Sequence, residues 1–152
     1  MKKIYLAGSC SSEQRTMMQR IAAKLRSENY TVYCPFELKI PDAWSMSQEA
    51  WSKKVFDKDI EALNECDVFL MISPGRYGTA GTNWEQGYAY AKGKKIVVMQ
   101  YTENSTSLMT FCGSNVFFST NLFDIETDVI DALFEAEILS DYGNKKCRTI
   151  LT

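Results

Sequence analysis

Histidine is absent from this 152-residue sequence, and its absence excludes several common kinds of enzyme chemistry. A Ser-His-Asp triad, a Cys-His pair and an imidazole acid or base all require that side chain, which is also the commonest metal ligand. Any catalysis by this chain therefore depends on carboxylates, hydroxyls, thiols, amines or backbone dipoles.

Paired cysteines and long apolar segments are missing as well. The five cysteines, at positions 10, 34, 66, 112 and 147, are an odd number at wide intervals without a CxxC pair, which favours neither a disulfide framework nor a zinc site. The apolar run near the amino terminus ends at Gly8, too short for a signal peptide, and no run of about 18 apolar residues exists to span a membrane. We therefore expect a reduced, cytoplasmic protein that uses no metal and no cofactor.

Excess charge of either sign is also lacking, since 17 Lys and Arg stand against 19 Asp and Glu, a formal net charge of −2. This slight acidity argues against nucleic acid as a partner and leaves small molecules as substrates. With 45% hydrophobic residues, 3 Pro and 8 Gly, the composition is that of an ordinary globular protein. We expect a single domain over residues 1–152, with a tail over residues 141–152 to which we assign no role.

Short apolar runs alternate with amphipathic segments along the chain. Strands are expected at residues 4–7, 31–34, 67–72, 95–99 and 116–118, and helices at about 11–26, 45–64, 84–92 and 128–139, the second of which opens with a capping box over residues 45–48. Such alternation predicts an α/β fold with right-handed crossovers: a five-stranded parallel sheet flanked by helices, in the flavodoxin-like or Rossmann-like order 2-1-3-4-5. A ligand then lies beyond the carboxyl ends of the strands, where the loops at Gly8-Ser9 and at residues 74–82 meet.

Asp59 lies in the middle of the apolar face of its expected helix, between Val55 and Leu63. A carboxylate facing the core costs several kcal/mol unless it is paired or hydrogen-bonded, so a functional reason for this position is expected. The structural alternative is that Asp59 caps a loop or backbone amides.

Glu85 lies at the start of the helix that follows the glycine-rich loop. Residues 82–85 fit the S/T-x-x-E pattern of a capping box, in which Glu85 would merely accept from the Thr82 amide. The functional alternative is a nucleophile, because the helix dipole keeps a carboxylate ionised at this place, at the mouth of the expected cleft.

Two carboxylates in one cleft, without histidine, are typical of enzymes that cleave or transfer glycosidic bonds. In retaining enzymes one carboxylate attacks the anomeric carbon and a second group manages protons. Tyr5, in the first strand, is in a position to reach the cleft and orient Glu85 through its hydroxyl, although a plain core tyrosine is an equal alternative.

The glycine-rich loop at residues 73–82 matches neither a P-loop nor a dinucleotide-binding motif. Its amides at a helix start, with the hydroxyls of Thr79 and Thr82, suit a single phosphate or a sugar hydroxyl. A tight strand-to-helix turn is the structural alternative.

Three segments in this order resemble the nucleoside 2-deoxyribosyltransferase family, which also includes deoxynucleoside 5′-monophosphate N-glycosidases. They are residues 3–8, 51–63 and 78–94, and the resemblance extends over residues 3–119. It implies that Glu85 is the nucleophile that takes the deoxyribosyl group, that Tyr5 positions it, and that Asp59 helps to protonate the departing base.

The same resemblance implies a set of substrate-binding residues: Gly8, Ser9, Trp51, Thr79, Gly81 and Ser107. Trp51 corresponds to a tryptophan of the transferases, and residues 107–109 resemble a segment that a neighbouring subunit lends to close the pocket. We therefore expect a homo-oligomer whose active site is completed by a neighbouring subunit.

Thr79 departs from the transferase pattern, in which an aspartate at this place contacts the 5′-hydroxyl of the sugar. In the monophosphate glycosidases the residue is a serine that touches the 5′-phosphate. A neutral hydroxyl tolerates a phosphate that a carboxylate would repel. We expect a transferase of nucleotide salvage that passes the sugar from a deoxyribosyl-Glu85 intermediate to another nucleobase, with a nucleoside 5′-monophosphate N-glycosidase as the alternative. A non-catalytic nucleotide-binding module is the third possibility.

Overall fold

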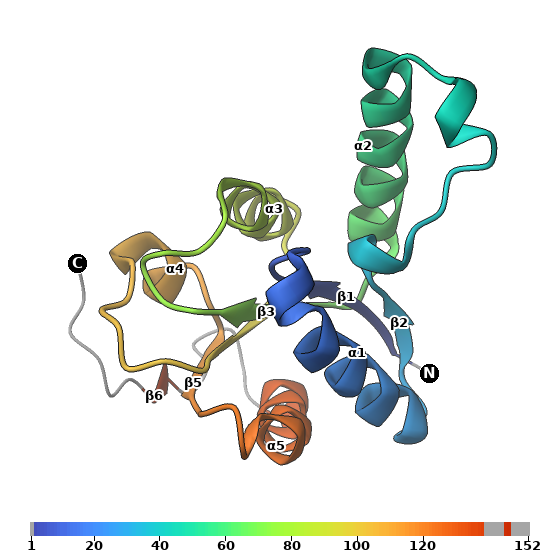
Figure 1. Cartoon of the computed structure of the whole chain (residues 1–152). Helices are drawn as coiled ribbons and strands as arrows, with labels where there is room; N and C mark the ends of the chain where they lie inside the picture. The colour runs from blue at the N-terminus through green and yellow to red at the C-terminus, as the bar shows by residue number, and fades with distance from the viewer. Residues whose placement is uncertain (1, 139–144, 147–152) are drawn as a thin grey trace.

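A parallel sheet forms the centre of the molecule, which the computed structural model describes for residues 2–138 and 145–146 (Figure 1). Its strands are β1 (Lys3–Ala7), β2 (Thr31–Tyr33), β3 (Val68–Ser73), β4 (Lys95–Gln100), β5 (Val116–Ser119) and β6 (Lys145–Lys146). They follow the order β2-β1-β3-β4-β5-β6, and every neighbouring pair is parallel. The predicted order 2-1-3-4-5 is thus confirmed. The two-residue β6, which has no apolar run to predict it, adds an edge strand.

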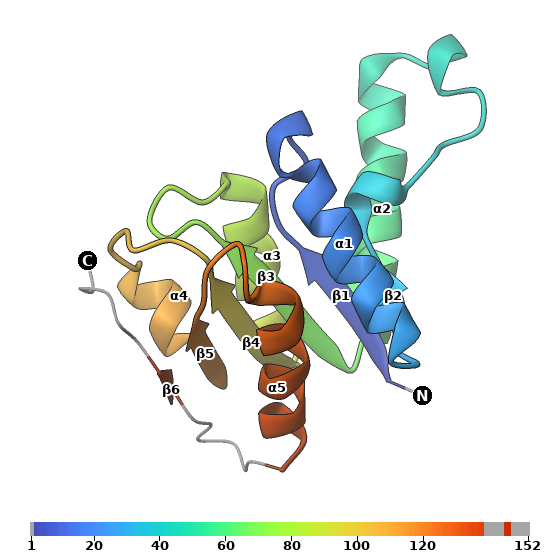
Figure 2. The same cartoon turned by 60° about the horizontal axis from the view of Figure 1, so that its bottom comes forward.

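Helices cover both faces of this sheet. They are α1 (Ser12–Ser27), α2 (Gln48–Glu65), α3 (Ala80–Ala91), α4 (Leu108–Cys112) and α5 (Ile125–Ile138), with short 3-10 helices η1 (Pro35–Glu37) and η2 (Ala43–Ser45). On one face, α1 and α5 pack through residues such as Ile21 and Val129, while α2, α3 and α4 cover the other through residues such as Leu63 and Ala89 (Figure 2). All six residues of β3 are consequently buried, which explains its uninterrupted apolar sequence.

Only the carboxyl-terminal part of α2 packs on the sheet. Leu63 is its buried residue, whereas residues 48–54 are all exposed. The helix rises beyond the edge of the sheet, accompanied by the chain between β2 and α2 (Figure 1). The projecting helix and the amino-terminal end of α3 therefore form two sides of an open space above the sheet.

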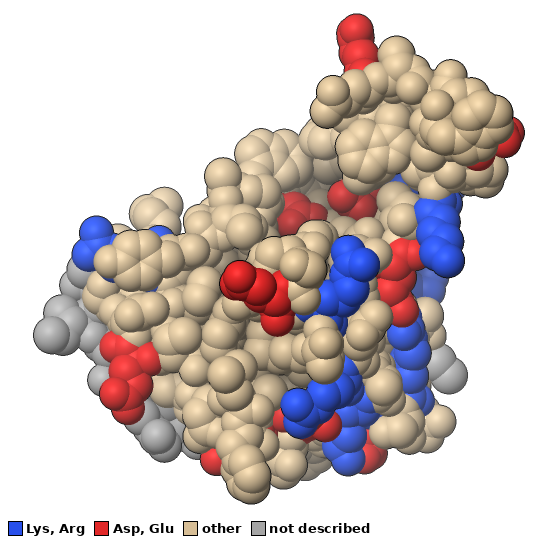
Figure 3. Space-filling view, in the orientation of Figure 1, with Lys and Arg blue, Asp and Glu red and all other residues tan. Residues whose placement is uncertain are grey.

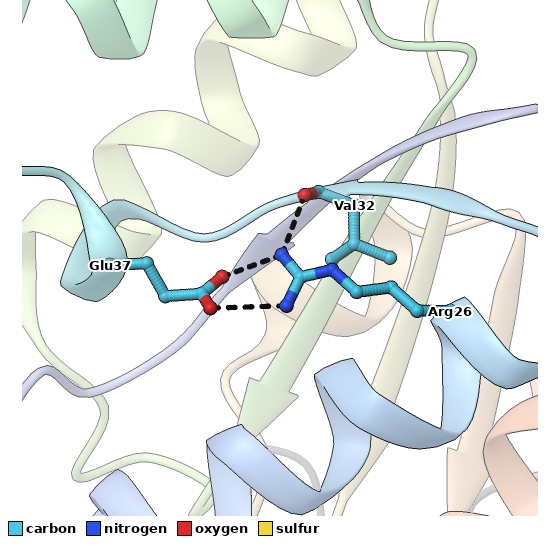
Figure 4. A network of polar contacts seen from close by, with 3 residues as sticks. All are labelled: Arg26, Val32 and Glu37. Atoms are coloured by element: carbon cyan, nitrogen blue, oxygen red, sulfur yellow. Dashed lines mark hydrogen bonds and ion pairs between the residues drawn. The ribbon is translucent and has the colours of Figure 1, made fainter.

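A bidentate ion pair fixes the start of the β2–α2 connection. Arg26 of α1 donates to both carboxylate oxygens of Glu37 in η1, at 3.0 and 2.7 Å, and to the carbonyl oxygen of Val32 at 3.0 Å (Figure 4). The guanidinium also lowers the pKa of Glu37. Pro35, which begins η1, is thereby held beside the open space.

The start of α3 differs from the prediction. The helix begins at Ala80, and the hydroxyl of Thr79 accepts from the amide of Thr82 at 3.3 Å. Thr79 is thus the N-cap, and the predicted capping box over Thr82 and Glu85 is wrong. Glu85 lies one turn further into the helix, so its carboxylate does not cap the helix start.

The remaining helix boundaries are close to the predicted ones. The N-cap of α2, however, is Ser47, which accepts from the amide of Ala50 at 3.1 Å, so the predicted capping box starting at Ser45 is wrong. α5 begins at Ile125, before the predicted Asp128, and the predicted end at Leu139 and the tail at residues 141–152 fall largely outside the described residues. α4 was not predicted, because five residues are too few for a periodic pattern. Within the part of the chain that the structure describes, no helix has both the length and the apolar character needed to cross a membrane.

Candidate active site

A cavity of about 660 Å³ lies between α2, the amino-terminal end of α3 and the loop after β1. This is the point where the strand order reverses, since β2 and β3 lie on opposite sides of β1. The hollow is visible beneath the projecting α2, with acidic atoms at its floor (Figure 3). Among the residues that line it are Asp59, Glu85, Gly8, Thr79 and Gly81, all of which the sequence singled out.

Glu85 receives a hydrogen bond from a tyrosine of the central sheet. Tyr5 is fully buried on β1, and its hydroxyl donates to Oε2 of Glu85. Burial, followed by the charge of Glu85, raises the pKa of Tyr5, so the phenol keeps its proton and remains a donor. The pair joins the sheet to α3 and leaves Oε1 as the second carboxylate oxygen at the cavity.

Burial raises the pKa of Glu85 from 4.5 to about 7. The hydrogen bond from Tyr5 favours the ionised form and opposes this effect, while the nearby charge of Asp59 adds to it. Desolvation is the largest of the three contributions. A carboxyl group kept ionised by the helix dipole was expected here, yet burial shifts the pKa of Glu85 in the opposite direction. Glu85 lies past the first helical turn, where the dipole is weaker.

Asp59 has a hydroxyl partner rather than the backbone amides of the structural alternative. Its Oδ1 accepts from the hydroxyl of Tyr33, at the end of β2, over 2.7 Å. Burial raises the pKa of Asp59, and the hydrogen bond from Tyr33 opposes that rise. The sequence analysis did not identify Tyr33, although a polar ring closing a strand beside the strand of Tyr5 was an available signal.

Two aromatic side chains and a thiol complete the cavity. Phe56 of α2 and Trp84 of α3 lie with ring centroids 5.6 Å apart and form part of its wall. Cys10 lines it from the loop after β1, and burial together with the charges of Glu85 and Asp59 raises the pKa of its thiol. Sequence reasoning assigned no role to these three residues, although Phe56 and Trp84 lie within the segments 51–63 and 78–94 that resemble the family.

A second, smaller cavity of about 210 Å³ adjoins the first. It is lined by Ser9, Gln14, Tyr77, Tyr101 and the adjacent loop, and it shares Thr79 and Thr82 with the larger cavity. Ser9, a predicted binding residue, therefore faces this compartment.

Trp51 and Ser107 do not line either cavity. Trp51 lies on the projecting part of α2 and is 41% exposed. Ser107 accepts from the amide of Thr110 at 3.5 Å as the N-cap of α4 and lines a separate space of about 410 Å³ between α3 and α4. Their contacts with substrate stay predictions.

Comparisons with known proteins agree on one family. The family model described as nucleoside 2-deoxyribosyltransferase matches residues 4–136. A 2-deoxyribosyltransferase from Bacillus psychrosaccharolyticus is 31% identical, with a TM-score of 0.71 over 82% of this chain and 90% of that chain. A search of curated proteins finds no match.

Two further solved structures share the fold. A CMP N-glycosidase from Clostridium botulinum is 23% identical, with a TM-score of 0.60 over 85% of this chain and 98% of that chain. A conserved protein from Enterococcus faecalis is 21% identical, with a TM-score of 0.62 over 88% and 98%. The family match spans most of the chain, and the deoxyribosyltransferase covers more than four fifths of it. The chain belongs to the nucleoside 2-deoxyribosyltransferase family.

Proposed function

We propose that this protein is a nucleoside 2-deoxyribosyltransferase that cleaves the N-glycosidic bond of 2′-deoxynucleosides and passes the sugar to another nucleobase. The observation that carries the proposal is the meeting of two carboxyl groups, Glu85 and Asp59, at one cavity, each with its own tyrosine donor. Membership of the family, and the 2-deoxyribosyltransferase at 31% identity, support the same activity.

Glu85 acts as the nucleophile. Because Tyr5 holds Oε2, the other oxygen of the ionised carboxylate attacks C1′ of the deoxyribose. The bond between C1′ and the base nitrogen breaks, and its electron pair leaves with the base, which takes a proton from Asp59. The second base then attacks C1′, releases Glu85 and returns a proton to Asp59.

The wall of the cavity favours a nucleobase over water as the acceptor. Phe56 and Trp84 offer apolar ring surface, and Ile60 and Pro35 extend it. A flat base buries area against such rings, and its presence excludes water from C1′.

Residues 107–109 are the part of this chain that we propose reaches a neighbouring subunit. Leu108 is 50% and Met109 76% exposed, beside the space between α3 and α4. Large apolar side chains on a surface are typical of an interface, and we propose a homo-oligomer on this ground.

A nucleoside 5′-monophosphate N-glycosidase is the second candidate, and the smaller cavity favours it. Thr79, Thr82 and Ser9 give it hydroxyls, the first turns of α1 and α3 border it, and its lining residues, all described, include no carboxylate. Helix starts and hydroxyls suit a phosphate.

Product analysis separates the candidates. The enzyme is incubated with 2′-deoxyuridine and adenine, and separately with 2′-deoxyuridine 5′-monophosphate alone, and products are resolved by chromatography. New 2′-deoxyadenosine supports the transferase, whereas uracil with deoxyribose 5-phosphate supports the hydrolase. Glu85→Ala is the control and should abolish either reaction. Absence of turnover with both substrates would leave a nucleotide-binding module and overturn the proposal.

A further inference from the structure

Three aromatic rings form a row across neighbouring strands on the face of the sheet beneath the cavity. The strand register pairs Tyr5 with Tyr33 on one side and with Phe69 on the other. The ring centroids are 5.3 Å apart between Tyr33 and Tyr5 and 5.7 Å apart between Tyr5 and Phe69, and both pairs are stacked. Because the rings follow the ladder, the backbone hydrogen bonds of the sheet fix their spacing.

Two rings of this row carry hydroxyls, and each hydroxyl donates to a carboxyl group on a different helix. Tyr5 donates to Glu85 on α3, and Tyr33 donates to Asp59 on α2. Through the two tyrosines, the carboxyl groups of both helices are therefore held by the same rigid sheet.

We propose that Tyr33 is a positioning residue for Asp59: its hydroxyl occupies Oδ1 and thereby presents Oδ2 as the oxygen that protonates the departing base. This inference rests on the proposed function of the cavity and adds a residue to it. Tyr33 donates to one carboxylate oxygen of Asp59, just as Tyr5 donates to one carboxylate oxygen of Glu85.

The proton balance fits this arrangement. Oδ1 of Asp59 accepts from Tyr33, and in the form that reacts we propose that Oδ2 carries a proton while Glu85 is ionised. As the bond from C1′ to the base breaks, the proton of Oδ2 passes to the base, and Asp59 is left as an anion that still accepts from Tyr33. The hydrogen bond to the anion is the stronger one, so it assists the departure of the proton.

The hydrogen bond from Tyr33 is important for Asp59 because the described groups around Asp59 include no cation. The titratable groups that face it are Tyr33 from β2, Tyr5 from β1, Glu85 from α3 and Cys10 from the loop after β1. Each is neutral or acidic, and no Lys or Arg is among the described residues that line the cavity. Burial and the charge of Asp59 raise the pKa of Tyr33, so it stays a donor.

The variant Tyr33→Phe tests the proposal, because it keeps the stacked ring and removes only the hydroxyl. Carbon-13 NMR of labelled aspartate carboxyl groups, assigned with Asp59→Asn, follows the titration of Asp59. We expect its pKa to be higher in Tyr33→Phe than in the wild type. The matched control is Tyr30→Phe, which makes the same change before the same strand and should leave Asp59 unaltered. An unchanged titration in Tyr33→Phe overturns the proposal.

Turnover of two substrates gives a readout that a merely structural role would not move. We expect Tyr33→Phe to lower kcat by about 10- to 100-fold with 2′-deoxyadenosine, less than the roughly 100- to 10,000-fold of a general acid because Asp59 itself remains, and to leave KM within about twofold. With 7-methyl-2′-deoxyguanosine, whose base departs without a proton, the loss should be several-fold smaller, as it should be in Asp59→Asn. An equal loss with both substrates overturns the proposal.

The two proposals fail separately. A wild-type enzyme without turnover overturns the proposed function, whereas the NMR titration needs no activity. An active wild type in which Tyr33→Phe leaves the titration of Asp59 unchanged, or loses kcat equally with both substrates, overturns the inference on Tyr33 alone.

Discussion

Replacing Glu85 with glutamine is expected to abolish turnover and, at alkaline pH, to stabilise the fold. The two effects have one cause, because the carboxylate that we propose as the nucleophile is held where burial disfavours its charge. Glutamine has nearly the same shape, can still accept a hydrogen bond from Tyr5, and carries no charge.

The magnitude follows from the pKa of Glu85, which rises from 4.5 to about 7 on folding. The difference of about 2.5, at about 1.4 kcal/mol for each pH unit, corresponds to about 3 kcal/mol. Between these values the folded chain binds more protons than the unfolded chain, so the contribution of Glu85 to stability falls as pH rises from 4.5 and reaches its minimum above about 7. The glutamine side chain does not ionise, so the Glu85→Gln variant does not lose this stability as pH rises.

Urea and thermal denaturation at pH 5 and pH 9 measure the effect. At pH 9 Glu85→Gln should be more stable than the wild type by about 3 kcal/mol, or about 6–12 °C in Tm for a chain of this size. At pH 5 the difference should shrink to about 1 kcal/mol. Glu103→Gln, at an exposed loop position, is the matched control and should change little at either pH. A Glu85→Gln variant no more stable than the wild type at pH 9 would refute the reasoning.

Three other predictions concern activity. With 7-methyl-2′-deoxyguanosine, whose base departs without a proton from Asp59, kcat/KM should rise as pH increases through about 7, because Glu85 attacks only when ionised, and a profile flat from pH 6 to 8 would contradict this assignment. Thr79→Asp should reduce turnover of nucleoside 5′-monophosphates far more than that of nucleosides, since it adds a carboxylate where the two cavities join; equal losses in steady-state assays would argue against phosphate in the smaller cavity. Met109→Glu should convert an oligomer into monomers with impaired activity, as light scattering after size-exclusion chromatography would detect, and a fully active monomeric wild type would exclude a shared site.

The strand order was predictable because strands that are buried on both faces of a sheet consist of uninterrupted apolar residues. The run in β3 is apolar throughout, and glycine or proline closes β1, β2 and β3. Asp59 was found by helical periodicity, a local signal. Glu85 was found as well, yet its helix was started one turn late, because both Thr79 and Thr82 can cap and the extended backbone of Thr79 decides between them.

The Tyr33 hydroxyl could not be paired with Asp59 from local patterns, which mark Tyr33 only as a polar ring at the end of β2. Its function depends on the register between β1 and β2 and on the position of α2, both of which link residues far apart in the chain. The roles of Trp51 and Ser107 came from resemblance alone, and in the folded chain each lies apart from the carboxyl groups. Motif matching locates residues along the sequence, whereas the row of Tyr33, Tyr5 and Phe69 exists only once the strands have paired in the sheet.

The projection of α2 gives the cleft one fixed side and one adjustable side. At about 1.5 Å per residue, Asp59 lies about 9 Å from the anchored end at Glu65, whereas Gln48 lies about 26 Å away. A tilt of the helix about that end therefore moves Asp59 only about a third as far as it moves Gln48. On the proposed function, such a tilt widens the outer cleft for a larger base and displaces Asp59 much less. Tolerance toward the base and accuracy at C1′ then belong to different parts of one helix.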